Sequence, residues 1–217
     1  VDIDAAIATA DGAISSGDYP GYSFGIHDGF GDVIGEQSRL HLDSDDLGNL
    51  RIGLEQGPGA FDDIIVVYFD TVTGGFDTTL SFSDDADDHR AAISGLASAS
   101  SDYSELNFAS GFEADYAIAW TASFAGLWQL DSVSHTYVGE LTISSGSGVF
   151  ELSDLTMADI GLQAGGTFDY LATYINGTNA FRADEFHGVS PNTVPAGNPG
   201  NNPGTVSLAA GDYNVFL

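Results

Sequence analysis

The sequence predicts an all-β protein, a jelly-roll-like antiparallel β-sandwich with one short helical turn. Apolar and polar residues alternate with a period of two in many short segments, and helical periodicity is scarce. Glycine and aspartate punctuate these segments at intervals of roughly 8–12 residues, which is typical of sandwiches and jelly rolls. The chain has 217 residues, an ordinary length for one such domain.

The strands are expected in order along the chain. Segment 39–42 alternates, residues 43–49 form a turn, and segment 50–54 returns. The continuous apolar run 64–69 predicts a central strand buried on both faces. Further strands are expected at residues 114–120, 126–130, 136–143 and 167–175.

One helix is expected at residues 152–160, with Ser153 as its N-cap and Gly161 at its end. Residues 91–98 are a weaker helical segment, or else a strand of small residues.

We divide the chain into four parts: an N-terminal strand and candidate donor segment (1–9), the sandwich (10–189), a proline-spaced arm (190–205) and a C-terminal strand (206–217). Prolines recur every four residues through the arm. Because proline supplies no donor to a strand ladder, the arm is not expected to form an inner strand.

The charge balance excludes some partners. The chain carries 32 acidic and 4 basic residues, for a formal net charge of -28, and it has no lysine. Lys and Arg supply most of the affinity for nucleic acids and anionic membranes, so neither is an expected partner. A hydrated acidic surface and a surface that collects divalent cations are both consistent with this composition.

The cysteine content limits the chemistry of this protein, and its first residue bears on its location. Cysteine is absent, which excludes thiol catalysis, cysteine-based zinc sites and disulfides. The chain begins at Val1, so we expect an extracellular or cell-surface protein whose signal peptide has been removed, although a chain cut there for another reason begins the same way. No apolar run approaches the ~20 residues that span a membrane.

Residues 10–19 resemble the opening pattern D-G-x-I-x-x-G-E-Y of secreted sandwich domains related to family-nine carbohydrate-binding modules and DOMON-like domains, with Asp18 in place of the glutamate. Segments 48–55 and 66–71 are similar to their central hairpin, and segments 150–155, 160–162 and 165–168 resemble their last helical turn and the strand after it. The resemblance covers most of the chain from about residue 10. It implies a jelly-roll-like sandwich on an exported bacterial protein and transfers no function.

The zinc-protease motif is missing from the sequence. No H-E-x-x-H pattern occurs, and carboxylates are so common that a glycosidase-like pair would arise by chance. We therefore expect a protein that is not an enzyme.

Two acidic segments are candidate cation sites. In the turn 43–49, Asp43, Asp45, Asp46 and Asn49 resemble half of a Ca²⁺-binding loop, and calcium is the expected cofactor, if any. Segment 83–89 is a second acidic cluster, with Arg90 as its nearby cation. A solvated loop is the alternative for each segment.

Trp120 and Trp128 align with apolar neighbours at a period of two, so we expect both in the core rather than on a sugar-binding surface. Asn176 begins an N-G-T sequon, which is expected either to carry a glycan or to remain bare.

We expect a structural subunit of an extracellular filament or surface layer that assembles head-to-tail with copies of itself. Sandwich monomers protect their edges with Lys, Pro or bulges, and this chain has no lysine. Both ends alternate as strands that could complete a neighbour's sheet. The apolar residues of these alternations are Val1, Ile3, Ala5, Ile7, Tyr213, Val215 and Leu217.

The N-terminal segment is the better donor, because it precedes the opening motif of the sandwich. The C-terminal strand follows the arm and can instead fold back onto its own sheet, and both ends can simply close their own domain. A carbohydrate-binding module with a polysaccharide partner is the alternative function.

Overall fold

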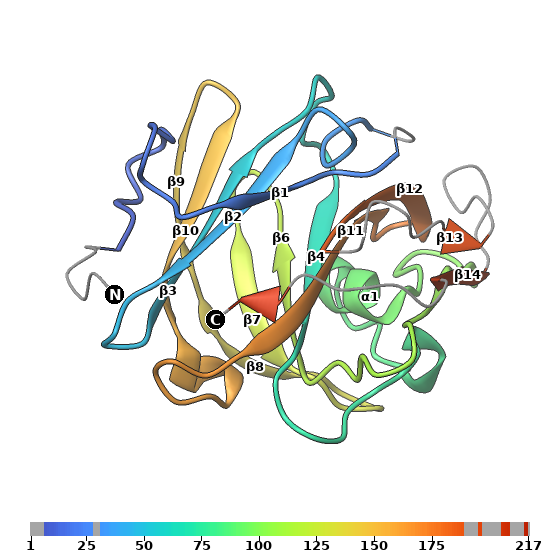
Figure 1. Ribbon diagram of the computed structural model, residues 1–217. Helices are drawn as coiled ribbons and strands as arrows, with labels where there is room; N and C mark the ends of the chain where they lie inside the picture. The colour runs from blue at the N-terminus through green and yellow to red at the C-terminus, as the bar shows by residue number, and fades with distance from the viewer. Residues whose placement is uncertain (1–6, 28–30, 189–194, 197–204, 209–214, 217) are drawn as a thin grey trace.

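The computed structural model describes residues 7–27, 31–188, 195–196, 205–208 and 215–216. Two antiparallel β-sheets pack face to face, which confirms the predicted sandwich (Figure 1). The smaller sheet has the order β1-β2-β3-β10-β9, with bounds Tyr22–Phe24, Arg39–Ser44, Asn49–Glu55, Val149–Thr156 and Thr142–Gly146. The larger has the order β12-β11-β4-β6-β7-β8, with bounds Phe181–His187, Phe168–Asn176, Ile64–Asp70, Tyr116–Trp120, Ala125–Gln129 and Thr136–Glu140.

The remaining elements are short. A third sheet joins β13 (Pro195–Ala196), β14 (Thr205–Leu208) and β5 (Glu105–Asn107), and its β14–β5 pair is parallel. The helices are η1 (Thr79–Ser81), α1 (Asp88–Ser94) and η2 (Met157–Ile160). None of the helices in the described segments is long and apolar enough to cross a membrane.

Strand β4 is the buried centre of the larger sheet, as its apolar run predicted. All six residues from Ile64 to Phe69 are buried. Ile65 and every second residue after it face the core between the sheets, where Trp120 lies. The intervening residues, which include Tyr68, face a second core that includes Trp128. Trp120 is 0% exposed and Trp128 is 4% exposed, so the prediction that both tryptophans are buried is confirmed.

A buried glutamate fixes the opening segment of the sandwich. Glu151 on β10 is fully buried and accepts hydrogen bonds from the backbone amides of Asp11 and Gly12, at 2.9 and 2.7 Å, and from the hydroxyl of Tyr19 at 3.0 Å. At Gly12, φ is +86° and an added Cβ would lie 2.7 Å from the carbonyl carbon of Ser145, so only glycine fits this close approach. The segment 10–19 therefore packs over the outer face of the smaller sheet.

The expected helix at residues 152–160 is wrong over its first half. Residues 152–156 continue β10, and only Met157–Ile160 is helical, with Thr156 rather than Ser153 as its N-cap. A bulge between Leu152 and Leu155 explains the error. The bulge turns both leucines toward the same core and so imitates the spacing of a helix in the sequence.

The expected strand at residues 136–143 is two strands. β8 ends at Glu140 and β9 begins at Thr142, and the two belong to different sheets. Leu141 is buried between them, and its amide donates to the carbonyl oxygen of Ala125 at 2.8 Å. The chain therefore crosses from one sheet to the other at this leucine.

The weaker helical segment at 91–98 is the helix α1, which begins earlier and ends at Ser94. Asp87 is its N-cap, and Gly95 ends it in the left-handed conformation with a φ of 68°.

The predicted assembly residues fall mostly outside the described part of the chain. Val1, Ile3, Ala5, Tyr213 and Leu217 belong to the segments that the structure does not describe, and so does most of the arm 190–205. Ile7 is described and lies outside any strand. Val215 belongs to β15 (Val215–Phe216), which pairs with Phe168 and Asp169 of this chain's own β11.

The hydrogen bonds of Glu151 lead to a test of stability. We expect Glu151→Ala to lower the free energy of unfolding by about 3 kcal/mol, because two amides and a hydroxyl lose their acceptor. Tyr19→Phe removes one of these hydrogen bonds and should cost about 1 kcal/mol. Urea unfolding followed by tryptophan fluorescence measures both; equal losses for the two variants would contradict the role of Glu151.

Candidate functional site

Five aromatic rings from α1, from β7 and β8 and from the residues just before these strands surround a hollow on the outer face of the larger sheet. We call this hollow the aromatic cleft. Its volume is about 500 Å³, and its lining residues are Asp87, His89, Arg90, Phe124, Trp128, His135 and Tyr137.

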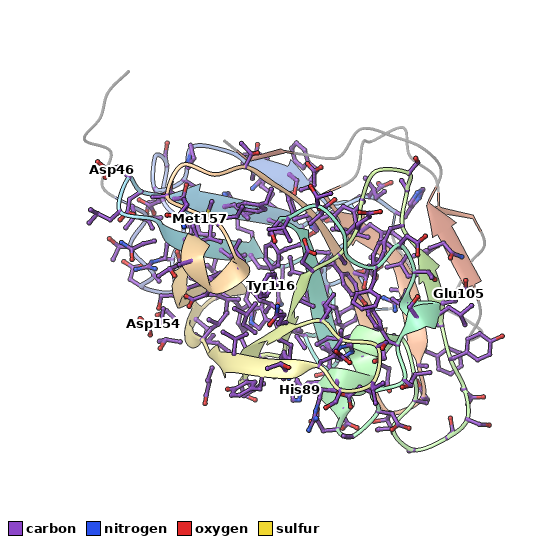
Figure 2. The ribbon with its side chains drawn as sticks, turned by 90° about the horizontal axis from the view of Figure 1, so that it is seen from below. Asp46, His89, Glu105, Tyr116, Asp154 and Met157 are labelled. Atoms are coloured by element: carbon purple, nitrogen blue, oxygen red, sulfur yellow. The ribbon has the colours of Figure 1, made fainter. Side chains whose placement is uncertain are left out.

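The first turn of α1 positions the polar residues that line one side of the aromatic cleft. Asp87 accepts hydrogen bonds from the amides of His89 and Arg90, both at 3.0 Å, and thereby caps the helix. This cap sets His89 and Arg90 on the first turn of α1, where Figure 2 shows His89 at the surface. The guanidinium of Arg90 returns to Asp87 with an Nε–Oδ2 distance of 2.7 Å.

The sheet supplies the other rings of the aromatic cleft. Trp128 on β7 lies opposite Tyr137 on β8, with ring centroids 5.4 Å apart. His89 lies 4.6 Å from Phe124 and stacks over Trp128 at 6.2 Å with an interplanar angle of 16°. Trp128 forms the buried floor of the aromatic cleft, whereas half of Tyr137 is exposed on its rim.

His135 joins β8 to the segment before α1. Its Nδ1 accepts from the amide of Asp131 at 3.3 Å, and its Nε2 lies 2.9 Å from the hydroxyl of Ser94. That hydroxyl donates to the carbonyl oxygen of Asp84, so Nε2 carries the proton and the ring is neutral. Burial lowers the pKa of His135 to about 4, although the nearby carboxylates of Asp84 and Asp131 act to raise it.

The chemistry of the aromatic cleft suits binding through stacking. Aromatic faces pack against the apolar faces of ring-shaped ligands, and the adjacent Asp87 and Arg90 can exchange hydrogen bonds with hydroxyl groups. Burial also lowers the pKa of His89, although Asp87 and Asp88 act to raise it. The imidazole that lines the aromatic cleft is therefore neutral near pH 7.

The structure also leaves strand edges without a partner. β8 ends the larger sheet, β9 and β1 end the smaller sheet, and none of these three has a strand on its outer side among the described residues. A bulge interrupts β8 opposite Leu127 and Trp128, whereas β9 pairs regularly with β10 over five consecutive residues.

The turn predicted to bind calcium uses much of its carboxylate chemistry internally. Asp45 accepts from the amides of Leu47 and Asn49 and from the side-chain amide of Asn49, and Asp43 accepts from the amide of Ala8 at 2.7 Å. Asp46 is exposed. No group of three or more potential ligands from His, Cys, Asp and Glu occurs in the described segments, so calcium at this turn stays a prediction.

The sequon asparagine is held by its neighbours. The Nδ2 of Asn176, the atom to which a glycan would attach, donates to Asp63, and its Oδ1 accepts from the amides of Thr178 and Asn179. Glycosylation of Asn176 stays a prediction.

A second hollow of about 610 Å³ lies beside the start of β11, with Asp70, Glu113 and Asp169 on its wall. Burial raises the pKa of Asp70 and of Asp169. The carboxylate of Asp70 holds the amide of Glu113 at 2.9 Å, which gives this side chain a structural role.

The pKa of His135 leads to a prediction about acid stability. Since the folded value is about 4 and the unfolded value about 6.5, the neutral ring contributes about 3 kcal/mol above pH 6.5, which is lost as the pH falls toward 4. An NMR titration of the imidazole should show no protonation until about pH 4. A His135 ring that titrates near pH 6.5 in the folded protein would contradict this account.

Comparisons with known proteins found no relative of this chain. No family model matches it, and neither a curated protein nor a solved structure does.

Proposed function

We propose that this chain is an extracellular structural subunit that joins copies of itself head-to-tail by strand donation. The observation that carries the proposal is the open, regular edge of β9. A donated strand adds main-chain hydrogen bonds along such an edge, and a head-to-tail contact of this kind need not close, so it can build a filament.

The sequence of β9 leaves this edge unprotected. The strand contains no charged residue and no proline, and no bulge interrupts its pairing with β10. Ile143 points inward and packs against the core between the sheets, yet it remains partly exposed, as does Phe150 on β10. A further strand beside β9 would cover both side chains.

Residues 1–7 fit this role as a donor from another copy. Their apolar residues alternate, so one face of an added strand would carry Val1, Ile3, Ala5 and Ile7 toward the core. Burying three or four such side chains at ~1.5–3 kcal/mol each would stabilise the joint. The strand β15 pairs within its own chain, which favours the N-terminal segment over the C-terminal one as the donor.

Two complementary variants test the proposal. Deleting residues 1–7 removes the donor, and Ser145→Lys places an inward-facing charge at the exposed end of β9, which should block the acceptor. Each variant alone should be a folded monomer by circular dichroism and sedimentation. A mixture of the two should form 1:1 dimers and no filaments in negative-stain images, because each partner supplies what the other lacks.

Filaments from the deletion variant would refute the N-terminal donor, and filaments from Ser145→Lys would refute the β9 acceptor. Tyr22→Lys, an exposed change on the distant strand β1, is the control and should assemble as the parent does.

A carbohydrate-binding module is a second candidate function, which the aromatic cleft favours. Phe124, Trp128 and Tyr137 converge there beside Asp87 and Arg90, and stacking rings next to polar groups are the usual means of binding sugars.

We expect Tyr137→Ala to weaken retention on polysaccharide columns by about tenfold, because the exposed ring contributes a stacking face worth about 1.4 kcal/mol. Tyr22→Ala removes an equally exposed tyrosine on the other sheet and should leave retention unchanged. Identical retention of both variants would exclude the aromatic cleft as the binding site.

A further inference from the structure

Five carboxylates lie close enough to the lining residues of the aromatic cleft to act on them electrostatically. Asp87 and Asp88 act electrostatically on the lining residue His89, and Asp84 and Asp131 act on His135. Glu140 acts in the same way on Tyr137 at the rim. A ligand in the aromatic cleft therefore meets a concentrated negative field.

The positive charge nearby is already compensated. Arg90 lies 2.7 Å from Asp87 and 3.6 Å from Asp84, and the latter carboxylate is buried. His89 and His135 are neutral near pH 7, and the chain contains no lysine. Among the described lining residues, no cation remains to receive a carboxylate or sulfate group of a ligand.

The aromatic faces of the cleft also favour a positively charged ligand. Trp and Tyr attract cations through the negative faces of their rings, and this attraction grows when the cation is partly removed from water. Tyr137 and Phe124 are accessible at the rim, with Trp128 below them. An ammonium group attached to a sugar ring would meet both the rings and the carboxylates.

We propose that the aromatic cleft selects saccharides that carry free amino groups, such as glucosamine polymers, over neutral and acidic ones. This inference rests on the second candidate function, sugar binding at the aromatic cleft, and adds the ligand's charge.

Calorimetry with three hexasaccharides tests the inference: a glucosamine hexamer, its fully N-acetylated form and a galacturonate hexamer. At about pH 5.5 the sugar amines are protonated, while hydrogen bonds that lower the pKa of Asp87 and of Asp131 keep these two carboxylates ionised. We expect the amine hexamer to bind about tenfold more tightly than the acetylated one, and this preference should shrink with added salt. The galacturonate hexamer should bind most weakly.

Substitutions distinguish binding at the aromatic cleft from general attraction to the acidic surface of the protein. Glu140→Gln should reduce the preference for the amine form, whereas Asp46→Asn should not, since Figure 2 shows Asp46 far from His89. Tyr137→Ala should weaken binding of the amine hexamer. Hexalysine carries a similar charge without sugar rings and should bind more weakly than the glucosamine hexamer.

Equal affinity for the amine and acetylated forms would overturn the charge selectivity while leaving sugar binding intact. Absence of binding by all three saccharides would overturn both. Tight amine binding that Tyr137→Ala does not change, or that hexalysine equals, would show attraction by the general acidic surface and would also overturn the inference.

Discussion

The burial of β4 on both faces is the constraint on which the rest of this structure depends. Ile65, Val67 and Phe69 require the smaller sheet as their cover, and Ile64, Val66 and Tyr68 require a second cover on the outer side. The helix α1 contributes to that cover, and the hydroxyl of Tyr68 donates to the carbonyl oxygen of Ile93 at 2.6 Å, which fixes the helix to the strand. The aromatic cleft lies where the start of α1 meets β7 and β8, so its position follows from the covering of β4.

Much of the fold could be predicted from the sequence because its signals are local. The run of six apolar residues at 64–69 identified the central strand, and the alternation around Trp120 and Trp128 placed both rings in a core. The predicted strand and helix boundaries were wrong where a single residue interrupts the regular alternation of a strand. The bulge in β10 imitated a helix, and the crossing at Leu141 joined two strands into one apparent segment. Neither change alters the local composition, so neither has a signal of its own in the sequence.

The candidate site was harder to predict because it forms only when distant segments converge. The acidic segment 83–89 and Arg90 were visible in the sequence, and so was Trp128, but nothing local indicated that His89 would stack over that ring. The pairing of Trp128 with Tyr137 had a weak signal, because the two lie on neighbouring strands of one hairpin. The turn at Asp45 shows the opposite case: its spacing resembles a cation loop, while its carboxylate oxygens accept hydrogen bonds that shape the turn itself.

Charge limits how copies of this chain can assemble. With a net charge of -28 and no lysine, two copies repel each other, and ion pairs between them are few. Strand addition avoids this difficulty, because its energy comes from main-chain hydrogen bonds and apolar side chains rather than from opposite charges. Dissolved salt screens the remaining repulsion beyond about 8–10 Å at physiological ionic strength, so added salt favours the proposed assembly. In such a filament each copy would repeat the aromatic cleft along its length, and many weak contacts to one polysaccharide would then combine into strong attachment.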